Sequence, residues 1–467
     1  MKNSTSKGIL FYLLLLVGVV FGIACILACI VIFSPGVEIF GISYFANNTT
    51  KKIETFNVSD VVVEQSLDAY ISDGRIQTIN FETNFVTINI KSSESNAYYI
   101  TIDSKDNGLS TNKDTQKLVY SSSYDTETKT YTLKAMGPES FFYFGKNSEI
   151  TLHVPRQKNF ANTSLSFKTE TGSISIGNNE KDDFTVKNIT ADVGNGYFLF
   201  NSLADISPSA SMNIKSQGGT VVVEGKLTMD QLNVESENSK ITIHDIVGNV
   251  NITTKDSNVS VGNITGDLYY SADAGLLKSK NISGNFEASE LVNIANIFVD
   301  EIGGKVLVPA SKSSNIEIKK VCDNLRINTE NGSVKIGEIC ANAEIITKNG
   351  SITCLVNSNQ TSNIILTTES GNIDARYKNI DGTSTITTTR GKVYFQFASG
   401  EVFELAYSCD KNKPNVNSIT TSDYSNSGSF AIGYDAESTC PNKVTITNKE
   451  GRSEFDNNLR EDYDVFK

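Results

Sequence analysis

The 467-residue chain contains no tryptophan, only two histidines and no tract of basic residues. Two histidines leave few groups for acid–base catalysis or metal binding near neutral pH. The 41 Lys and Arg are outnumbered by 53 Asp and Glu, which gives a net charge of −12, whereas phosphate recognition needs clustered cations. We therefore expect no nucleic-acid partner, no cofactor and no metal site.

Residues 8–33 form an apolar run without a single charge. As a helix of about 1.5 Å per residue this run would be about 39 Å long, enough to span a bilayer with tilt. A cleaved signal peptide is the main alternative, although its apolar core is usually only about 7–15 residues long. Cys29 loosely fits a lipoprotein processing site, but the apolar run continues past it to Phe33. The sequence predicts a transmembrane helix.

The charges beside this run predict its orientation. Lys2 and Lys7 precede the run, and no acidic residue comes before Glu38. By the positive-inside rule, residues 1–7 form a cytoplasmic tail and residues 34–467 lie outside the cell. The sequence thus predicts a single-pass protein of the cell membrane with an extracellular C-terminal region.

A short motif repeats every 18–24 residues beyond residue 160. It is clearest in TETGSISIG (169–177), NTENGSVKIG (328–337), ITKNGSITC (346–354) and TTESGNIDA (367–375). The turn residues of the successive repeats are Gly172, Gly196, Gly219, Ser239, Ser257, Gly275, Asn293, Ser314, Gly332, Gly350, Gly371 and Gly391. Asn293 is placed by spacing alone. We expect glycine at these turns because it tolerates positive φ.

Columns of similar residues flank the turn residues. The column two residues after the turn is apolar and includes Leu277, Ala295, Ile316, Val334, Ile352, Ile373 and Val393. The column five residues before it is also apolar and includes Ala288, Pro309, Ile327, Ile345, Leu366 and Ile386. Three residues before the turn the chain usually has Thr or Ser, for example Thr329, Thr347, Thr368 and Thr388. Alternation with period two on both sides of a turn predicts two short strands per repeat.

Equally spaced strand pairs predict an all-β fold, a parallel β-helix (β-solenoid) of about 11–12 rungs over residues 161–400. An antiparallel β-sandwich also has alternating strands, but it does not explain a column that stays apolar at nearly equal spacing. Residues 34–54 are expected to form a linker. Residues 55–160 and 401–467 contain strand-like runs and are expected to cap the open ends, since exposed strand edges invite aggregation.

The cysteines predict free thiols or disulfides but no zinc site, because no CxxC pair or Cys/His cluster is present. Cys322 and Cys340 are one repeat apart, so they would lie about 4.8 Å apart on adjacent rungs. The sequence does not decide between a disulfide and two free thiols at this pair. Cys409 and Cys440 are predicted to form a disulfide in an exported C-terminal loop. Cys354 occupies an inward position and is expected to be buried and inert.

The charged residues predict a solvated face. The column two residues before the turn contains Glu170, Gln217, Glu237, Lys255, Asp273, Lys312, Glu330, Lys348 and Glu369. Opposite charges on adjacent rungs would form weak pairs worth about 0.2–1 kcal/mol each. A polysaccharide-cleaving β-helix would instead need clustered carboxylates. His153 is interpreted as an ordinary strand residue and His244 as an outward residue, so we assign no catalytic, cofactor-binding or metal-binding residue.

The strand ITLHVP (150–155) followed by LSFKTETGSISIG (165–177) resembles the bacterial putative-adhesin domain family of unknown function. Its members have a β-rich lead-in, a Val-Pro strand and then rungs containing Thr-x-x-Gly-x-Ile. The resemblance covers roughly residues 80–400 and implies a solenoid, commonly behind one N-terminal membrane helix. It brings no catalytic residues, and its adhesin label rests on fold analogy.

These features favour a membrane-anchored extracellular module that binds without catalysis. Its expected partners are the membrane, through residues 8–33, and envelope polysaccharide or another surface or membrane protein. The alternative is an accessory protein of envelope-stress sensing or signalling. A carbohydrate-active enzyme is the third hypothesis, and the absence of a carboxylate cluster speaks against it.

Overall fold

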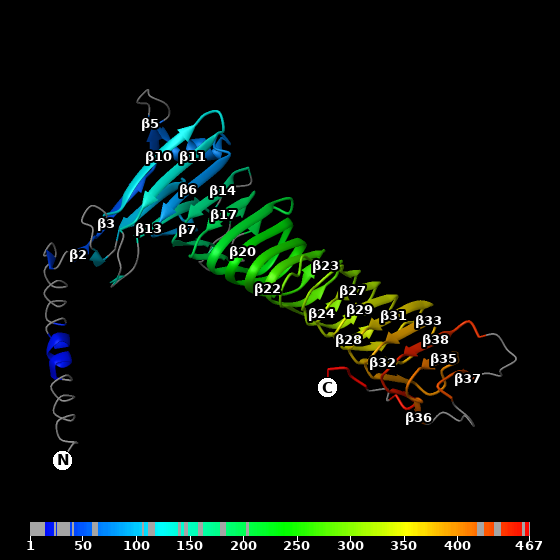
Figure 1. Cartoon of the computed structure of the whole chain (residues 1–467). Helices are drawn as coiled ribbons and strands as arrows, with labels where there is room; N and C mark the ends of the chain where they lie inside the picture. Colours follow the sequence, from blue (N-terminus) through cyan, green and yellow to red (C-terminus); the bar gives the residue numbers. More distant parts are fainter. Residues whose placement is uncertain are drawn as a thin grey trace, which may run out of the picture. The chain divides into compact units, whose positions relative to one another are not determined.

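The computed structural model (Figure 1) describes residues 15–22, 25, 38–39, 42–57, 64–104, 107–110, 117–138, 142–143, 148–156, 162–177, 184–201, 205–417, 425–433, 440–459 and 463–466. The chain divides into two compact units, residues 1–184 and 185–467. Residues 15–22 are helical, and the rest of the predicted span 8–33, except residue 25, lies outside the described residues. Within the described ranges, no helix has the length and apolarity needed to cross a membrane.

Besides the helical residues 15–22, the described part of the first unit consists of short β-strands and the short helix α2. Its elements are β1 (Glu38–Ile39), β2 (Ile42–Ala46), β3 (Thr49–Ile53), β4 (Thr55–Asn57), β5 (Glu64–Ser66), α2 (Leu67–Ser72), β6 (Thr78–Asn84), β7 (Val86–Ser93), β8 (Tyr99–Ser104), β9 (Asn107–Ser110), β10 (Val119–Asp125), β11 (Thr130–Met136), β12 (Phe142–Tyr143), β13 (Ser148–Pro155), β14 (Ser164–Thr169) and β15 (Gly172–Ile176).

Three pairs of strands in this unit stack in parallel, so layers like those of the solenoid begin within the region expected to be a cap. Strand β6 pairs with β11 on one side and β14 on the other, while β7 pairs with β13 and β15. Thr83 and Thr169 are paired, as are Val86 and Gly172, so β6 and β7 meet at the same corner as β14 and β15. The outermost layer carries antiparallel strands, β10 on β11 and β8 on β13.

The second unit is almost entirely β-structure. Its strands are β16 (Thr185–Val186), β17 (Ile189–Val193), β18 (Tyr197–Phe200), β19 (Asp205–Ile206), β20 (Ser211–Val261), β21 (Ile264–Thr265), β22 (Leu268–Ile282), β23 (Phe286–Ser289), β24 (Ala295–Ile302), β25 (Val306–Val308), β26 (Ile316–Val321), β27 (Leu325–Thr329), β28 (Val334–Ile339), β29 (Ala343–Thr347), β30 (Ile352–Val356), β31 (Ser362–Thr368), β32 (Ile373–Tyr377), β33 (Gly382–Thr388), β34 (Val393–Phe397), β35 (Phe403–Cys409), β36 (Asn415–Asn417), β37 (Ser427–Ile432), β38 (Lys443–Asn448) and β39 (Ser453–Asp456).

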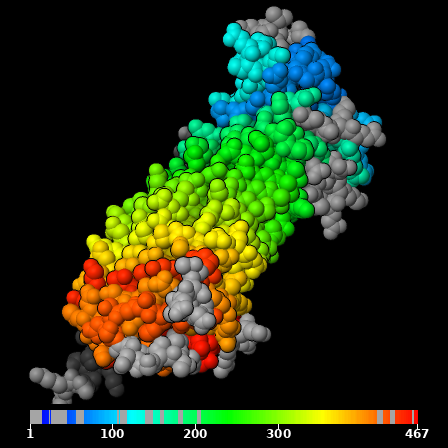
Figure 2. Space-filling view, turned by 90° about the vertical axis from the view of Figure 1, so that its right-hand side faces the viewer, coloured from blue at the N-terminus to red at the C-terminus, as the bar shows by residue number. Residues whose placement is uncertain are grey.

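Parallel pairing between successive repeats confirms a solenoid-like stack in this unit. The strands before each turn form a first sheet in which β25, β27, β29, β31 and β33 pair in succession. The strands after each turn form a second sheet that runs through β24, β26, β28, β30, β32 and β34. The long strands β20 and β22 continue around the corners, so each contributes residues to both the first and the second sheet. In the space-filling view, the unit's successive segments follow one another as coloured bands (Figure 2).

The register predicted from the sequence is wrong at two positions. Leu277 pairs with Ile297 rather than Ala295, which lies beside Gly275. The corner after β23 is two residues longer than the spacing indicated, and Glu290 enters it with φ of 54°. Pro309 is also misplaced in its column. It is exposed just after β25, and Val308 pairs with Ile327 in its stead.

The core contains a further apolar column, which was not predicted from the sequence. Ile264, Ile282, Ile302, Val321 and Ile339 stack in register just beyond the second sheet, and all are buried. Each lies seven residues after the turn position once Ala295 takes the place of Asn293. This column adds to the inward positions on both strands of a rung, such as Ile318, Ile336 and Cys354, and together they keep the interior of a narrow stack dry.

One layer near the end of the second unit, formed by β38 and β39, is inserted out of chain order. After β34, the chain forms β35 and β36 first and returns to build β38 and β39 between them and the preceding rung. Strand β38 pairs in parallel with both β33 and β35, and β39 pairs with both β34 and β36. The antiparallel strand β37 then lies on β35. The segment ITNKEGRSEF (446–455) is thus one more rung, with Asn448 in the threonine position and Gly451 in the turn position.

Buried threonines connect the rungs at their corners. The Thr368 hydroxyl accepts a hydrogen bond from the Gly371 amide at 3.0 Å and donates one to the Gly350 carbonyl of the previous rung at 3.0 Å. Thr347 and Thr388 repeat this arrangement with their own glycines. Each hydroxyl therefore satisfies one amide in its own rung and one carbonyl in the rung before it.

Glycine is required at these corners for a reason other than the one we predicted. Gly219 and Gly275 do have positive φ, of 101° and 118°. Gly172 and the later turn glycines Gly332, Gly350, Gly371 and Gly391 do not. A Cβ atom at Gly350 would instead collide with the carbonyl oxygen of Gly332, because the backbones approach too closely for any side chain.

We expect replacement of Thr368 by valine to lower the free energy of unfolding by about 1–3 kcal/mol, because it leaves the Gly371 amide and the Gly350 carbonyl buried without a partner. The neighbouring Thr367→Val is the matched control, since Thr367 points outward on the same strand. Urea unfolding of both variants gives the comparison, and equal losses would contradict the role of the corner hydroxyl.

Candidate interaction surface

The outward side chains of the second unit form polar ladders along its stacking direction. The Asn233 amide donates to Asn213 Oδ1 at 2.7 Å, and Asn251 donates to Asn233 Oδ1 at 2.9 Å. The same bond joins Asn342 to Asn324 at 2.8 Å. Such ladders present rows of amides at the spacing of the rungs, about 4.8 Å.

Ion pairs also connect adjacent rungs. Lys319 lies 2.7 Å from Asp300, and Arg326 lies 3.0 Å from Glu344. In the column predicted to alternate in charge, Lys255 pairs with Glu237 at 2.8 Å. No other ion pair joins two members of that column within the part of the chain that the structure describes. The charges fix register weakly, because these groups are exposed.

The described surface is hollowed shallowly rather than cut by a deep cleft. On the first sheet a hollow of about 480 Å³ lies over β25, β27, β29 and β31, where Leu307 and Ile365 are flanked by Lys305 and the Arg326–Glu344 pair.

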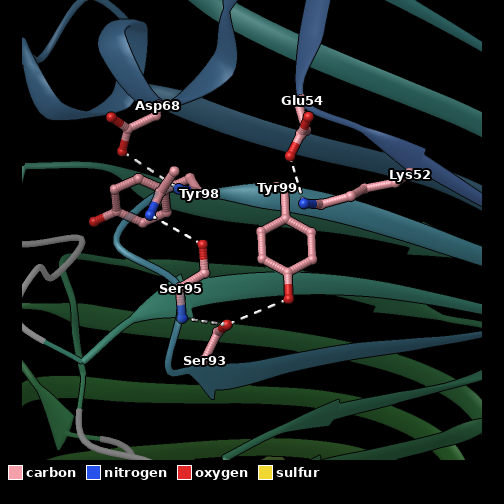
Figure 3. A network of polar contacts seen from close by, with 8 residues as sticks. Lys52, Glu54, Asp68, Ser93, Ser95, Tyr98 and Tyr99 are labelled. Atoms are coloured by element: carbon pink, nitrogen blue, oxygen red, sulfur yellow. Dashed lines mark hydrogen bonds and ion pairs between the residues drawn. The ribbon is translucent and has the colours of Figure 1, made fainter.

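The Tyr99 ring in the first unit is enclosed by two other side chains. His153 stacks on it with ring centroids 4.2 Å apart and planes 8° apart, and the Lys52 ammonium lies 4.2 Å from its centroid. The Tyr99 hydroxyl lies 3.3 Å from Ser93 Oγ, and Lys52 also pairs with Glu54 (Figure 3). Because both faces of the ring are in use, Tyr99 has no free face for a ligand.

The neighbouring hydrogen bonds shape the loop between β7 and β8. Ser93 Oγ accepts from the Ser95 amide at 3.1 Å, and Ser95 Oγ accepts from the Ala97 amide at 3.3 Å. The Tyr98 amide donates to Asp68 Oδ1 at 3.3 Å (Figure 3). The network therefore positions a loop, as side chain-to-backbone bonds of this kind commonly do.

His153 is held neutral by its surroundings. Burial, reinforced by the nearby cations Lys91 and Lys52, lowers the pKa of His153 to about 4. Its Nε2 lies 2.9 Å from Thr101 Oγ1. The second histidine, His244, is exposed at a shallow hollow that also includes Lys226, Asp245 and Lys280. The described contacts of His153 are thus the Tyr99 ring and the Thr101 hydroxyl, while His244 lies among exposed polar side chains.

The predicted disulfide between Cys409 and Cys440 is wrong, and both thiols are free. Cys409 ends β35, where its thiol donates to Ser453 Oγ at 3.4 Å. Cys440 lies at the other end of that strand, with its thiol 3.6 Å from the Val402 carbonyl. Seven residues of strand separate the two by about 23 Å, far beyond the reach of a disulfide.

Cys322 and Cys340 lie on adjacent rungs, as the spacing predicted, but they are not bridged. The Cys322 thiol contacts Glu301 at 3.6 Å, and the Cys340 thiol contacts Glu338 at 3.5 Å. Burial raises the pKa of Cys340 to about 12, and that of Cys322 is also raised, so both remain protonated thiols. Cys354 is buried, as predicted, and burial raises its pKa as well.

Metal-binding chemistry finds no support in the described ranges. They contain no group of three or more His, Cys, Asp or Glu side chains able to hold a metal ion.

A comparison of the sequence with models of known protein families identifies a match over most of the chain. The family model described as Toastrack DUF4097 matches residues 76–275 and again residues 267–452. The chain belongs to the Toastrack DUF4097 family. The two matches meet inside β22, so the family pattern occurs twice in succession. The resemblance found in the sequence is confirmed, and a solenoid-like all-β fold is shown for this Toastrack chain.

Comparison with solved structures and curated proteins adds little. One similar chain is described as a putative cell adhesion protein from Clostridium sporogenes ATCC 15579. It is 9% identical, with 88% of this chain and 99% of that chain covered, at a TM-score of 0.14. A score that low supports no argument about fold or function. No curated protein matches the Toastrack chain.

We expect the His153 ring to stay neutral until the pH falls near 4, whereas an unfolded histidine takes up its proton near pH 6.5. Its contribution to stability is therefore full above pH 6.5 and is lost as the pH falls toward 4. Histidine NMR signals over this range measure the pKa, with the signal assigned from the His153→Gln variant. A pKa at or above 6.5 would contradict the proposed environment.

Proposed function

We propose that this Toastrack protein is a membrane-anchored extracellular module that binds surface polymers without catalysis. The observation that supports it is the repetition of outward polar groups from rung to rung. Amide ladders such as Asn213–Asn233–Asn251 and cross-rung pairs such as Arg326–Glu344 present similar chemistry many times along one direction.

A periodic surface favours a periodic ligand. Each amide or ion pair offers a weak contact, but a polymer that engages several rungs turns later contacts into intramolecular ones and gains affinity without stronger individual bonds. A parallel β-helix of about 11–12 rungs would present this surface over a length on the order of 60 Å at about 4.8 Å per rung. Envelope polysaccharide has the required repetition and hydroxyl groups.

The anchor in this proposal is residues 8–33, and its support is the apolar sequence. A helix there would hold residues 34–467 on the outer side of the membrane with residues 1–7 in the cytoplasm. Anchoring suits a binding module, because it turns contact with a polymer into attachment of the cell surface.

The binding prediction can be measured with the full chain in lipid nanodiscs and a size series of envelope polysaccharides. We expect affinity to rise at least tenfold from short oligosaccharides to polymers that span several rungs, with no cleavage products. Arg326→Gln combined with Asn342→Ala should weaken polymer binding several-fold, since both residues border the hollow over β27 and β29. Length-independent affinity, or turnover of any polymer, would refute the proposal.

The topology prediction is tested in whole cells with a membrane-impermeant thiol reagent. In a chain whose seven native cysteines are replaced by alanine, a cysteine at exposed Ser333 should be labelled in intact cells, and a cysteine at Ser4 only after the membrane is opened. A variant with Leu14→Arg and Val17→Arg should lose membrane retention, because charges within a span are costly. Labelling of the Ser4 variant in intact cells would exclude the orientation, and membrane retention of the double-arginine variant would exclude the anchor.

A further inference from the structure

The C-terminal segment runs back over the second sheet instead of leaving the end of the stack. The Leu459 amide donates to the Phe397 carbonyl of β34 at 3.2 Å. Tyr463 then lies over Arg376 of β32, and Phe466 lies over Lys335 of β28. In Figure 1 the C-terminus accordingly lies beside the middle strands of this unit. The segment thus crosses successive strands in reverse chain order.

The second sheet is shaped to receive this segment. Leu355 occupies an outward position of β30, yet it is only 3% exposed because Leu459 and Val465 pack over it. Gly337 stands in the same outward column, where neighbouring rungs carry Lys319 and Leu355. A Cβ atom at Gly337 would lie 2.8 Å from the Phe466 ring. An apolar residue and a notch thus face outward where the tail lies.

Contacts between cations and aromatic rings hold the tail on the second sheet. The Arg376 guanidinium lies 3.8 Å from the centroid of the Tyr463 ring, and the Lys335 ammonium lies 4.3 Å from that of Phe466. Asp464, between these two aromatic residues in the chain, is near Lys319. The surface therefore binds an acidic segment with two aromatic residues by placing cations against its rings.

The surface under the tail continues beyond its end. A hollow of about 290 Å³ begins at Phe466 and extends over β26, β24 and β22, where Lys319, Lys278 and Phe298 line it beside Asp300 and Glu317, with Lys319 paired to Asp300. The tail therefore fills only part of a longer strip, in which Lys278 and the Phe298 ring are further positions for an aromatic and acidic segment.

We propose that this strip of the second sheet is a docking site for acidic peptide segments that contain aromatic residues, with the C-terminal segment as its occupant within the same chain. A partner segment of this composition displaces the tail and, being longer, also contacts Lys278 and Phe298. The proposal does not depend on polymer binding, since the ladders and the hollow considered for polymers lie elsewhere on this unit.

The test uses a fluorescent peptide with the sequence of residues 459–467 and a scrambled peptide as control. In the full chain, Tyr463→Ala with Phe466→Ala removes the two rings that hold the tail. We expect this variant to bind the peptide at least tenfold more tightly than the unaltered protein, and to ignore the scrambled peptide. Adding Arg376→Gln should weaken binding at least fivefold, whereas Arg326→Gln on the first sheet should not.

Equal binding by the unaltered and tail-weakened proteins, both folded by circular dichroism, would overturn the proposal. Equal changes in peptide affinity for Arg376→Gln and Arg326→Gln would also overturn it. A second measurement needs no variant: carboxypeptidase trimming of the unaltered chain should accelerate several-fold at saturating peptide, because displacement frees the tail. Trimming that does not change with peptide would refute the exchange even if the tail-weakened variant failed to fold.

Discussion

A buried hydroxyl at the corner of each rung is the interaction on which the later part of the stack depends. Backbones of adjacent rungs approach so closely at Gly332, Gly350, Gly371 and Gly391 that side chains cannot enter, and an unpaired amide or carbonyl there would have no water to bond. The threonine three residues earlier supplies both the acceptor and the donor. Glycine allows the backbones of adjacent rungs to approach, and threonine supplies hydrogen bonds to the amide and carbonyl groups buried there. Because both residues are needed at the same corner, the Thr-x-x-Gly pattern is the clearest signal in the sequence.

In the rungs before this region, serine side chains take the place of the threonines and form hydrogen bonds between rungs. The hydroxyl of Ser216 lies 3.0 Å from that of Ser239, and Ser236 lies 3.1 Å from Ser257, so pairs of serines bond directly across rungs. Gly219 and Gly275 adopt positive φ at these corners, where a Cβ atom would also collide with the carbonyl oxygen of the previous rung. Once the corners are fixed, side chains along each strand alternate between the dry interior and the outer surface. The outward side chains form the amide ladders and the ion pairs.

Much of the stack could be predicted because each corner repeats the same short-range chemistry. Prediction failed where the local sequence did not determine the path. The loop after β23 adds two residues that contain no turn signal, which shifted Ala295 out of its column. The Cys409–Cys440 bridge failed because both the order and the direction of strands in the last layers are long-range properties. The tail's place over Leu355 was equally invisible, since an isolated outward leucine gives no indication of what covers it.

The inserted layer formed by β38 and β39 has a consequence for how the protein is made. A solenoid can in principle add rungs in the order in which the chain emerges, but here the slot between β34 and β36 is filled only by residues 443–456. Until those residues arrive, β33, β34, β35 and β36 have strand edges without their final partners. A chain that stops short of them leaves an open strand template, which is an aggregation hazard. The arrival of residues 443–456 is thus the step that closes this part of the stack.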